Sequence, residues 1–385
     1  DIAGSSFCGT FYTYKESCSI LCLGAMLIPS SQGAALGVAL LSMVCWGSWS
    51  NLLKFTGDRM RFELFYLNFS AGVFLTALLA AFTLGMVKSN GAHGDYSFLD
   101  DFSGIGFDRY IFALLAGIVF NVANLMLCKG IAMLGLALAF PLCIGTSMVL
   151  GTLLTYAISP SDTGKPAFLF LGVLLAFSAV CAAAFMHRIK EHQQRKCRNP
   201  LMQAETPEAR LAQDNDEPPM GRKLLVCIVG GILMSLWNPL VTLAEKDPGL
   251  SPFGEFVLYT LATLLSSFVL CPLIIKFPLE GGSGETVGAV LPQYKTSPGV
   301  CHLYGFLGGF IWAVGTLANA MAGASKVLNS AESYAIGQCA NVAAIFWGIF
   351  LFNEFEGTDM KVKGLVALVV ALYAGAIALI TAAGS

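Results

Sequence analysis

Charged residues are scarce in this chain of 385 residues, at 12%, against about 25% in an ordinary soluble domain. Hydrophobic residues make up 56% of the chain. This composition excludes an ordinary soluble domain and indicates an integral membrane protein of many helices. The net charge of −2 comes without a basic patch interleaved with aromatic residues, so the sequence gives no sign of nucleic-acid binding.

Metal and catalytic motifs are also missing. The four histidines are scattered without zinc spacing, and most of the 12 cysteines stand singly in apolar runs. Only the pairing of Cys8, Cys18 and Cys22 is left open by their spacing. The glycine-rich GGSGETVGA does not match a P-loop, and no nucleophile stands in a typical context beside a base. We therefore expect no cofactor, no metal and no enzymatic activity.

The N-terminal residues 1–32 precede the first long apolar run. Lys15 is followed by the short apolar stretch Ile20–Ile28 and then by small polar residues. This order resembles the charged and apolar regions of a signal peptide, and a short interfacial segment is the alternative. We expect residues 1–32 to be the remnant of a signal or targeting sequence.

Ten apolar runs of about 20 residues or more follow, each long enough to cross a hydrocarbon core about 30 Å thick. The predicted spans are 34–55, 63–87, 109–130, 133–158, 166–187, 223–244, 253–276, 301–323, 329–352 and 363–382. The strongly hydrophilic connection 188–222 divides them five and five, and its charged, proline-containing sequence is typical of a disordered cytosolic linker.

Lysine and arginine predict the orientation. Most of the 22 lie in the connections after spans one, three, five, seven and nine, including those of the 188–222 linker. Cytosolic loops carry this excess, so we expect the linker in the cytosol and both termini outside or in a lumen.

The two halves of the chain resemble each other. Trp49 and Asn51 of span one have counterparts in Trp237 and Asn238 of span six. Three glycine pairs repeat at a similar offset: Gly117 and Gly309, Gly151 and Gly348, Gly172 and Gly364. Because each half contains five spans, the second half is inverted relative to the first. The predicted fold is all-α integral membrane, with ten transmembrane helices as two inverted five-helix repeats over residues 33–187 and 223–385.

Polar and aromatic side chains recur inside the spans at helical spacing. In span nine, Tyr334, Gln338 and Asn341 lie within about 40° of one another on a regular helix, so they form one polar stripe. Polar groups in hydrocarbon face a bundle interior or a watery cavity, or they bond to neighbouring helices. The candidate substrate-binding residues are Trp46, Trp49, Asn51, Asn121, Asn124, Trp237, Asn238, Trp312, Thr316, Tyr334, Gln338 and Asn341.

Indoles and amides suit a neutral, polar, ring-shaped solute, because the ring stacks and the amide both donates and accepts. No basic cluster lies within the spans, which disfavours phosphorylated substrates. Glu332, one turn into span nine, is the candidate coupling or gating residue, although it lies about 160° from Tyr334 on a regular helix. Inverted repeats are a recurring plan of secondary transporters that work by alternating access.

Seven segments resemble the drug/metabolite transporter superfamily, and within it the ureide permeases and their bacterial glucose/ribose/rhamnose-uptake relatives. They are CWGSWSNLLK (45–54), YLNFSAGVFLTALLAAFTLG (66–85), GIVFNVANL (117–125), VLGTLLTY (149–156), GILMSLWNPLVTLAEK (231–246), GFLGGFIWAVG (305–315) and QCANVAAIFWGIFLFNEF (338–355).

The resemblance implies a ten-helix permease with a basic central cytosolic loop. Plant members carry allantoin-like ureides and pyrimidine bases with protons, and bacterial relatives take up sugars. It favours Trp49, Asn124, Trp237 and Gln338 as cavity residues. Two features depart from the family: Asn68 stands where plant members have an aspartate, and no phosphate-loop-like element is present.

We therefore expect a permease in the plasma membrane that moves a neutral sugar, ureide or nucleobase, with protons as the coupling ion. Its partners are a small-molecule substrate and the lipid bilayer, and the sequence leaves the oligomeric state open. Two alternatives remain: an organellar nucleotide-sugar or triose-phosphate transporter, and a non-transporting membrane sensor or assembly protein. The first requires a cationic cavity, and the second predicts amides that serve only packing.

Overall fold

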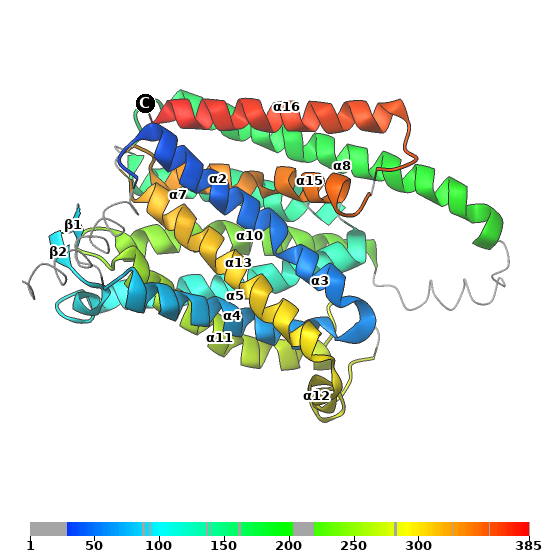
Figure 1. The fold of residues 1–385 in the computed structure, drawn as a ribbon, viewed down its shortest axis with the longest axis horizontal. Helices are drawn as coiled ribbons and strands as arrows, with labels where there is room; N and C mark the ends of the chain where they lie inside the picture. Colours follow the sequence, from blue (N-terminus) through cyan, green and yellow to red (C-terminus); the bar gives the residue numbers. More distant parts are fainter. Residues whose placement is uncertain are drawn as a thin grey trace, which may run out of the picture.

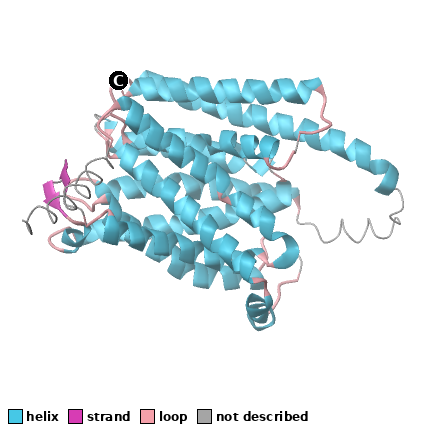
Figure 2. Cartoon of the chain, in the orientation of Figure 1, coloured by secondary structure: helices cyan, strands magenta, loops and turns pink. Residues whose placement is uncertain are grey.

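The computed structural model describes residues 29–384 except 87–88, 92–93, 136–137, 140, 161–162, 203–218, 281–282, 326 and 354. Among the described residues, ten helices are long and apolar enough to cross a membrane, which confirms the predicted number of spans. They run side by side in one bundle (Figure 1). The only strands among the described residues are two short antiparallel ones, paired in a hairpin at one end of the bundle (Figure 2). Most of the expected signal remnant, with Cys8, Cys18 and Cys22, lies outside the described residues.

The elements follow the predicted order along the chain. In the first half they are α2 (Gln32–Ser48), α3 (Ser50–Thr56), η1 (Gly57–Arg59), α4 (Phe62–Thr83), β1 (Ser89–Gly91), β2 (Gly94–Tyr96), η2 (Phe98–Phe102), α5 (Phe107–Leu134), η3 (Pro141–Gly145), α7 (Thr146–Ile158) and α8 (Pro166–Met202). In the second half they are α10 (Met220–Glu245), α11 (Pro252–Lys276), α12 (Val287–Thr296), α13 (Gly299–Gly323), α14 (Ser330–Gly337), η5 (Gln338–Ala340), α15 (Asn341–Phe350) and α16 (Met360–Ala383).

Two packed groups make up the bundle. One buried apolar cluster joins α4, α5, α10, α11 and α13, and a second joins α2, α8, α14, α15 and α16. α8 and α16 pack along each other at one edge of the bundle (Figure 1). α8 continues beyond the apolar span to Met202, so the first part of the segment predicted as disordered linker is helical. Residues 203–218 lie outside the described part of the chain.

Three spans are not continuous α-helices. Span four begins at Pro141 rather than at the predicted residue 133, because Gly135 ends α5 with a positive φ of 71°. Its first turn, η3, is a π-helix. Span nine changes to a 3₁₀ turn, η5, and span one is divided at Trp49 into α2 and α3. Such irregular turns re-aim the side chains that follow them.

Glycines allow several helices to approach at backbone distance. A Cβ added to Gly309 of α13 would lie 2.2 Å from the carbonyl oxygen of Phe69 on α4. On α5, a Cβ at Gly117 would lie 2.1 Å from the carbonyl oxygen of Tyr259 on α11. A Cβ at Gly364 of α16 has nothing within 4 Å.

Gly309→Ala is expected to destabilise the protein by about 1–3 kcal/mol, because α4 must move away from the new methyl group. Gly364→Ala is the matched control, and we expect it to be neutral or stabilising by up to about 1 kcal/mol, since alanine favours a helix over glycine. Thermal unfolding of both purified variants in detergent measures the difference. Equal unfolding temperatures would contradict the close contact.

Candidate substrate site

An open cavity of about 520 Å³ lies at the end of the bundle that contains the C-terminus of α16. We call it the vestibule. Its walls are Thr155, Ser159, Thr242, Glu245, Lys246, Asp247, Leu250, Pro252, Gly323, Ala324, Ser325, Val327, Leu328, Asn329, Ser330, Ala331 and Gly384. Its volume falls in the range of small-molecule sites, about 300–1,000 Å³.

A second, smaller cavity adjoins the vestibule, and three lining residues, Glu245, Gly323 and Ser330, are common to both. We call it the inner cavity. Its volume of about 20 Å³ is close to that needed for one water molecule. It is lined by Trp237, Asn238, Val241, Glu245, Glu255, Phe256, Tyr259, Thr316, Asn319, Ala320, Gly323 and Ser330. The vestibule therefore leads towards Trp237 and Thr316, two of the predicted site residues.

Aromatic rings surround this inner cavity. Trp237 packs edge-on against Trp46 at 5.9 Å between ring centroids and against Tyr334 at 5.7 Å. Trp312 stacks on Tyr259 with an angle of 10° between the planes. Aromatic pairs favour such stacked and edge-to-face geometries. Three predicted tryptophans, from spans one, six and eight, thus meet in one cluster.

Two polar predicted residues lie beside this cluster. Thr316 accepts a hydrogen bond from Trp46 Nε1 at 3.1 Å and lines the inner cavity. Asn238 donates to Thr155 Oγ1 at 2.9 Å, so it links α10 to α7. Both side chains line the inner cavity and carry donor and acceptor groups.

The span-three amides are engaged in packing. Asn121 accepts from Tyr66 Oη at 2.9 Å and donates to Ser266 Oγ at 2.7 Å, which ties α4, α5 and α11 together. Asn124 donates to the same Tyr66 oxygen at 3.0 Å. In span one, Trp49 packs on Phe69 at 4.7 Å, away from the cavities. None of these residues is among those that line the two cavities.

Asn51, Gln338 and Asn341 are buried but also absent from the cavity walls. The stripe predicted in span nine does not lie along one wall. Tyr334 Oη bonds to Ser147 Oγ of α7 at 2.7 Å, whereas Asn341 donates to Tyr373 of α16 at 3.4 Å. The 3₁₀ turn η5 between them changes the rotation that a regular helix would give.

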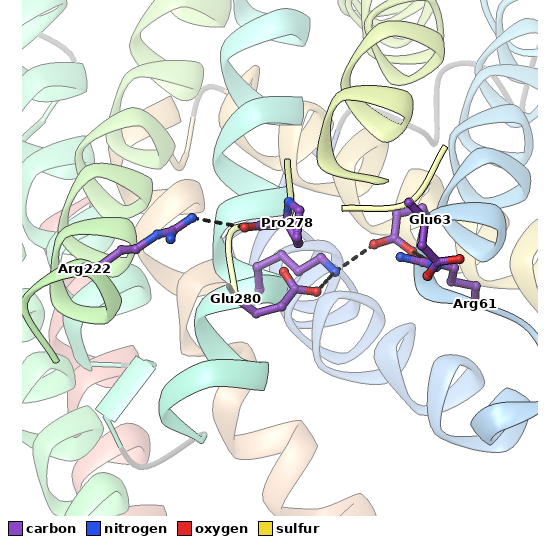
Figure 3. Close-up of polar contacts among 7 residues, drawn as sticks. Arg61, Glu63, Arg222, Pro278 and Glu280 are labelled. Carbon is purple, nitrogen blue, oxygen red and sulfur yellow. Dashed lines mark hydrogen bonds and ion pairs between the residues drawn. The ribbon is translucent and has the colours of Figure 1, made fainter. Parts of the chain in front are cut away.

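Charged side chains join the helices at the opposite end of the bundle, and Figure 3 shows their contacts. Lys129 Nζ lies 2.8 Å from Glu63 Oε1 and 2.5 Å from Glu280 Oε1. Glu63 also pairs with Arg61 at 2.9 Å, and Arg61 reaches Glu285. We call these five residues the ion-pair network. It connects the start of α4 and the end of α5 to the segment that follows α11.

The helix α12 lies across the same end (Figure 1). Tyr294 of α12 donates to Asn68 Oδ1 at 2.5 Å, and Asn68 Nδ2 lies 3.2 Å from His302 Nδ1. Arg222, at the start of α10, donates to the carbonyl oxygen of Pro278 at 3.0 Å (Figure 3). Asn68, the departure from the plant pattern, therefore holds α12 to the bundle.

A family model and known relatives both carry the name ureide permease. The family model "Ureide permease" matches residues 65–223. Ureide permease 2 of Arabidopsis thaliana is 22% identical and covers 93% of this chain and 98% of its own length. Ureide permease 4 of the same plant is 23% identical with the same coverage. These matches support the ureide permease family. The similarity to ureide permeases extends over both halves, beyond the residues that the family model matches.

One solved crystal structure superimposes on 91% of the chain, and 96% of its own chain is covered, with a TM-score of 0.52. Its sequence is 15% identical, so the likeness concerns the fold alone. Permeases are transporters and not enzymes. The ten apolar helices therefore describe a multi-pass membrane protein, and its similarity is to transporters.

Sequence reasoning missed the carboxylates of the site. Glu245 ends α10 and Glu255 lies in the first turn of α11, and both line the inner cavity. The available signal was two acidic residues at facing span ends across one short connection. Glu332, the predicted coupling residue, instead accepts from the Asn329 backbone N–H at 3.1 Å in a capping box, and it is not among the cavity-lining residues.

Proposed function

We propose that this protein is a secondary transporter that moves a small neutral polar solute, of ureide or nucleobase type, by alternating access. One observation carries the proposal: a cavity of solute size opens at one end and leads to the buried indole of Trp237, while ion pairs join the helices at the other end. A site that water reaches from one side only is what an outward- or inward-facing transporter requires.

The inner cavity must widen beyond its volume of about 20 Å³ to admit a solute, and the chemistry of its walls favours a flat, uncharged one. Trp237 and Tyr259 offer aromatic faces, and Asn238 and Thr316 offer polar atoms beside them. The relatives are called ureide permeases, and a ureide combines planarity with several N–H and C=O groups. A neutral sugar, as in the bacterial relatives of the wider superfamily, is the second solute class for the same polar groups.

Equivalent contacts in the two halves support the inverted repeat. Gly117 of span three meets the carbonyl of Tyr259 on span seven, and Gly309 of span eight meets that of Phe69 on span two. Gly117 corresponds to Gly309 in the sequence repeat, and Tyr259 stands in span seven where Phe69 stands in span two. α5 also packs on α10, as α13 packs on α2. A rocking motion of two such halves is the common basis of alternating access.

Phosphorylated solutes fit this site poorly. Among the described residues that line the two cavities, Lys246 is the one cation, and Glu245, Asp247 and Glu255 are the carboxylates. A phosphate there would face an acidic surface, which costs free energy rather than gaining it. The nucleotide-sugar and triose-phosphate alternative is therefore not favoured.

The orientation follows from the basic connections. We place the end with the ion-pair network, α12 and the extension of α8 in the cytosol, and the vestibule outside, in the plasma membrane. Uptake with protons is the coupling that we infer for this arrangement, since the vestibule would then receive both the solute and the ion.

Proteoliposomes that contain the purified protein are expected to take up labelled allantoin or uracil faster than empty liposomes, and faster with an inward proton gradient. Labelled glucose is the comparison for the sugar class, and a triose phosphate is the control for an anionic solute. No flux of allantoin, uracil or glucose under any gradient would contradict the proposal and favour a non-transporting membrane protein.

A further inference from the structure

Two acidic side chains lie where the proposed transport path narrows. Glu245 and Glu255 both line the inner cavity, and Glu245 also lines the vestibule. Glu255 is buried, with 2% of its surface exposed. They come from different helices, α10 and α11, on either side of one short connection.

One oxygen of each carboxylate is left unsatisfied by the protein. Within the described part of the chain, Oε1 of Glu245, Oε1 of Glu255 and Oη of Tyr259 are enclosed and have no hydrogen-bond partner. Tyr259 is 1% exposed. A buried carboxylate that is ionised and unpaired is very costly, so such a group is paired, takes up a proton or binds a cation. The arrangement points to a small positive ligand.

The neighbouring charged groups do not supply that cation. Asp101 of η2 adds a third carboxylate, which accepts from Ser251 N at 2.9 Å. The Glu332 carboxylate of α14 caps its own helix through Oε2, and its Oε1 is also enclosed without a partner among the described residues, but Glu332 does not line either cavity. Arg109 of α5 bonds to the Leu243 carbonyl and lies 3.6 Å from Asp108.

Lys246 is the nearest lysine in sequence, and its Nζ is directed to the Ile158 carbonyl at 3.5 Å. Asp247 beside it is exposed in the vestibule. In the described residues, neither Glu245 nor Glu255 is in an ion pair within 4.0 Å with a lysine, arginine or histidine side chain, so the charge balance at the inner cavity is negative.

A proton fits this cavity better than a divalent metal ion. With about 20 Å³, the cavity has room for about one water molecule beside two carboxylates and one phenol. Divalent cations take about six to eight oxygen ligands, and no group of three or more acidic, histidine or cysteine ligands lies together among the described residues. Two neighbouring carboxylates commonly hold one proton between them.

We propose that Glu245 and Glu255 form the proton-binding site of the transporter. A proton from vestibule water adds to a carboxylate oxygen, and it leaves to water on the other side after the vestibule closes and the opposite end opens. This inference rests on the proposed function, and it assigns the coupling role to α10 and α11 instead of to Glu332.

The same cavity explains how proton and solute are coupled. Trp237, Asn238 and Thr316 share its walls with the two carboxylates, and Tyr259 stacks on Trp312 while its hydroxyl is unpartnered. A solute in the vestibule, against the walls that the two cavities share, keeps water from the inner cavity and makes an ionised carboxylate more costly. Each ligand therefore favours the binding of the other, as linkage requires.

The first experiment uses no solute. The apparent unfolding temperature of the purified full chain is measured from about pH 5.5 to about pH 8, because a proton held only by the folded state stabilises it at low pH and is lost as pH rises. We expect the wild-type protein to lose stability over this range, and Glu245→Gln and Glu255→Gln to lose less. Glu356→Gln, at an exposed carboxylate, is the matched control and should behave as the wild type.

A pH dependence that is identical in all four proteins would overturn the site. A second outcome would also overturn the proton site: sodium stabilises the wild-type protein more than choline does, the Gln variants abolish this difference, and pH has no effect. The pair would then bind a metal ion.

The second experiment measures the ratio of allantoin uptake with an inward proton gradient to uptake without it. Glu255→Gln should reduce this ratio about 5- to 150-fold. If the wild-type ratio is itself smaller than this factor, the ratio of the variant should fall to one. An unchanged ratio would overturn the assignment. If the wild-type protein carries no allantoin, the proposed solute fails, and the unfolding experiment still decides whether the pair binds a proton.

Discussion

Trp237→Leu is expected to lower the initial rate of allantoin uptake into proteoliposomes by about 5- to 150-fold. Stacking of a flat ring on an aromatic side chain is worth about 1–3 kcal/mol, and Trp237 lines the inner cavity to which the vestibule leads. Leucine keeps an apolar side chain at the position but removes the ring face. Trp237→Phe keeps a smaller face and should lose less.

The matched control is Trp347→Leu. Trp347 donates to Ser48 Oγ at 2.6 Å on α2 and is not among the residues that line the two cavities. This change removes the same atoms from the same type of helix, so a general effect on folding appears in both variants. Equal losses of uptake, or unchanged uptake in Trp237→Leu with normal expression, would contradict the proposed solute site.

Lys129→Met should shift the protein away from the state with the open vestibule. Lys129 holds Glu63 of α4 and Glu280 after α11 together, and its removal leaves the Glu63 carboxylate buried at 2% exposure with one fewer partner. Loss of one partner of a buried pair costs about 3–5 kcal/mol. Since 1.4 kcal/mol is a factor of ten in an equilibrium, the vestibule-open population should fall at least about tenfold.

The measurement is the rate at which a membrane-impermeant thiol reagent modifies Ser330→Cys, a vestibule position, in a background without other accessible cysteines. Lys276→Met is the control, because Lys276 lies at the same end, over the ring of Phe277, and outside the ion-pair network. The double variant Glu63→Gln/Lys129→Met should recover part of the labelling rate, since it removes the unpaired charge. Identical labelling in all variants would contradict the closing role.

Most of the fold could be predicted from the lengths of the apolar runs in the sequence. Ten runs of sufficient hydropathy predicted ten spans, and the hydrophilic 188–222 segment marked the midpoint. The errors fall where the backbone leaves α geometry. These places are the π turn at Pro141–Gly145 and the 3₁₀ turn at Gln338–Ala340. Both depend on tertiary packing, because Gly231 lies against the backbone of the first turn and Gly47 against that of the second. No local sequence pattern predicts either turn.

The site was only partly readable. Trp46, Trp237 and Trp312 lie in one aromatic cluster, because large rings inside a span need an interior partner. Of the three, Trp237 lines the inner cavity, and their role in substrate binding stays a prediction. Amides give an ambiguous signal in the sequence. Asn121 forms hydrogen bonds with α4 and α11, whereas Asn238 lines the inner cavity, although both residues have the same hydropathy. Glu245 and Glu255 stand at span ends, where a carboxylate is usually solvated, so only the three-dimensional packing shows that one oxygen of each is enclosed.

The ion pairs of the network differ in how deeply they are buried, so we expect salt to weaken them in two stages. The side chains of Lys129 and Glu63 are 7% and 2% exposed, whereas those of Arg61 and Glu285 are 27% and 51% exposed. Salt at cellular strength screens exposed charges over about 8 Å and affects enclosed ones much less. The ionic strength on that side therefore loosens the outer pair first, while the inner pair sets a resistance to opening that salt leaves nearly unchanged.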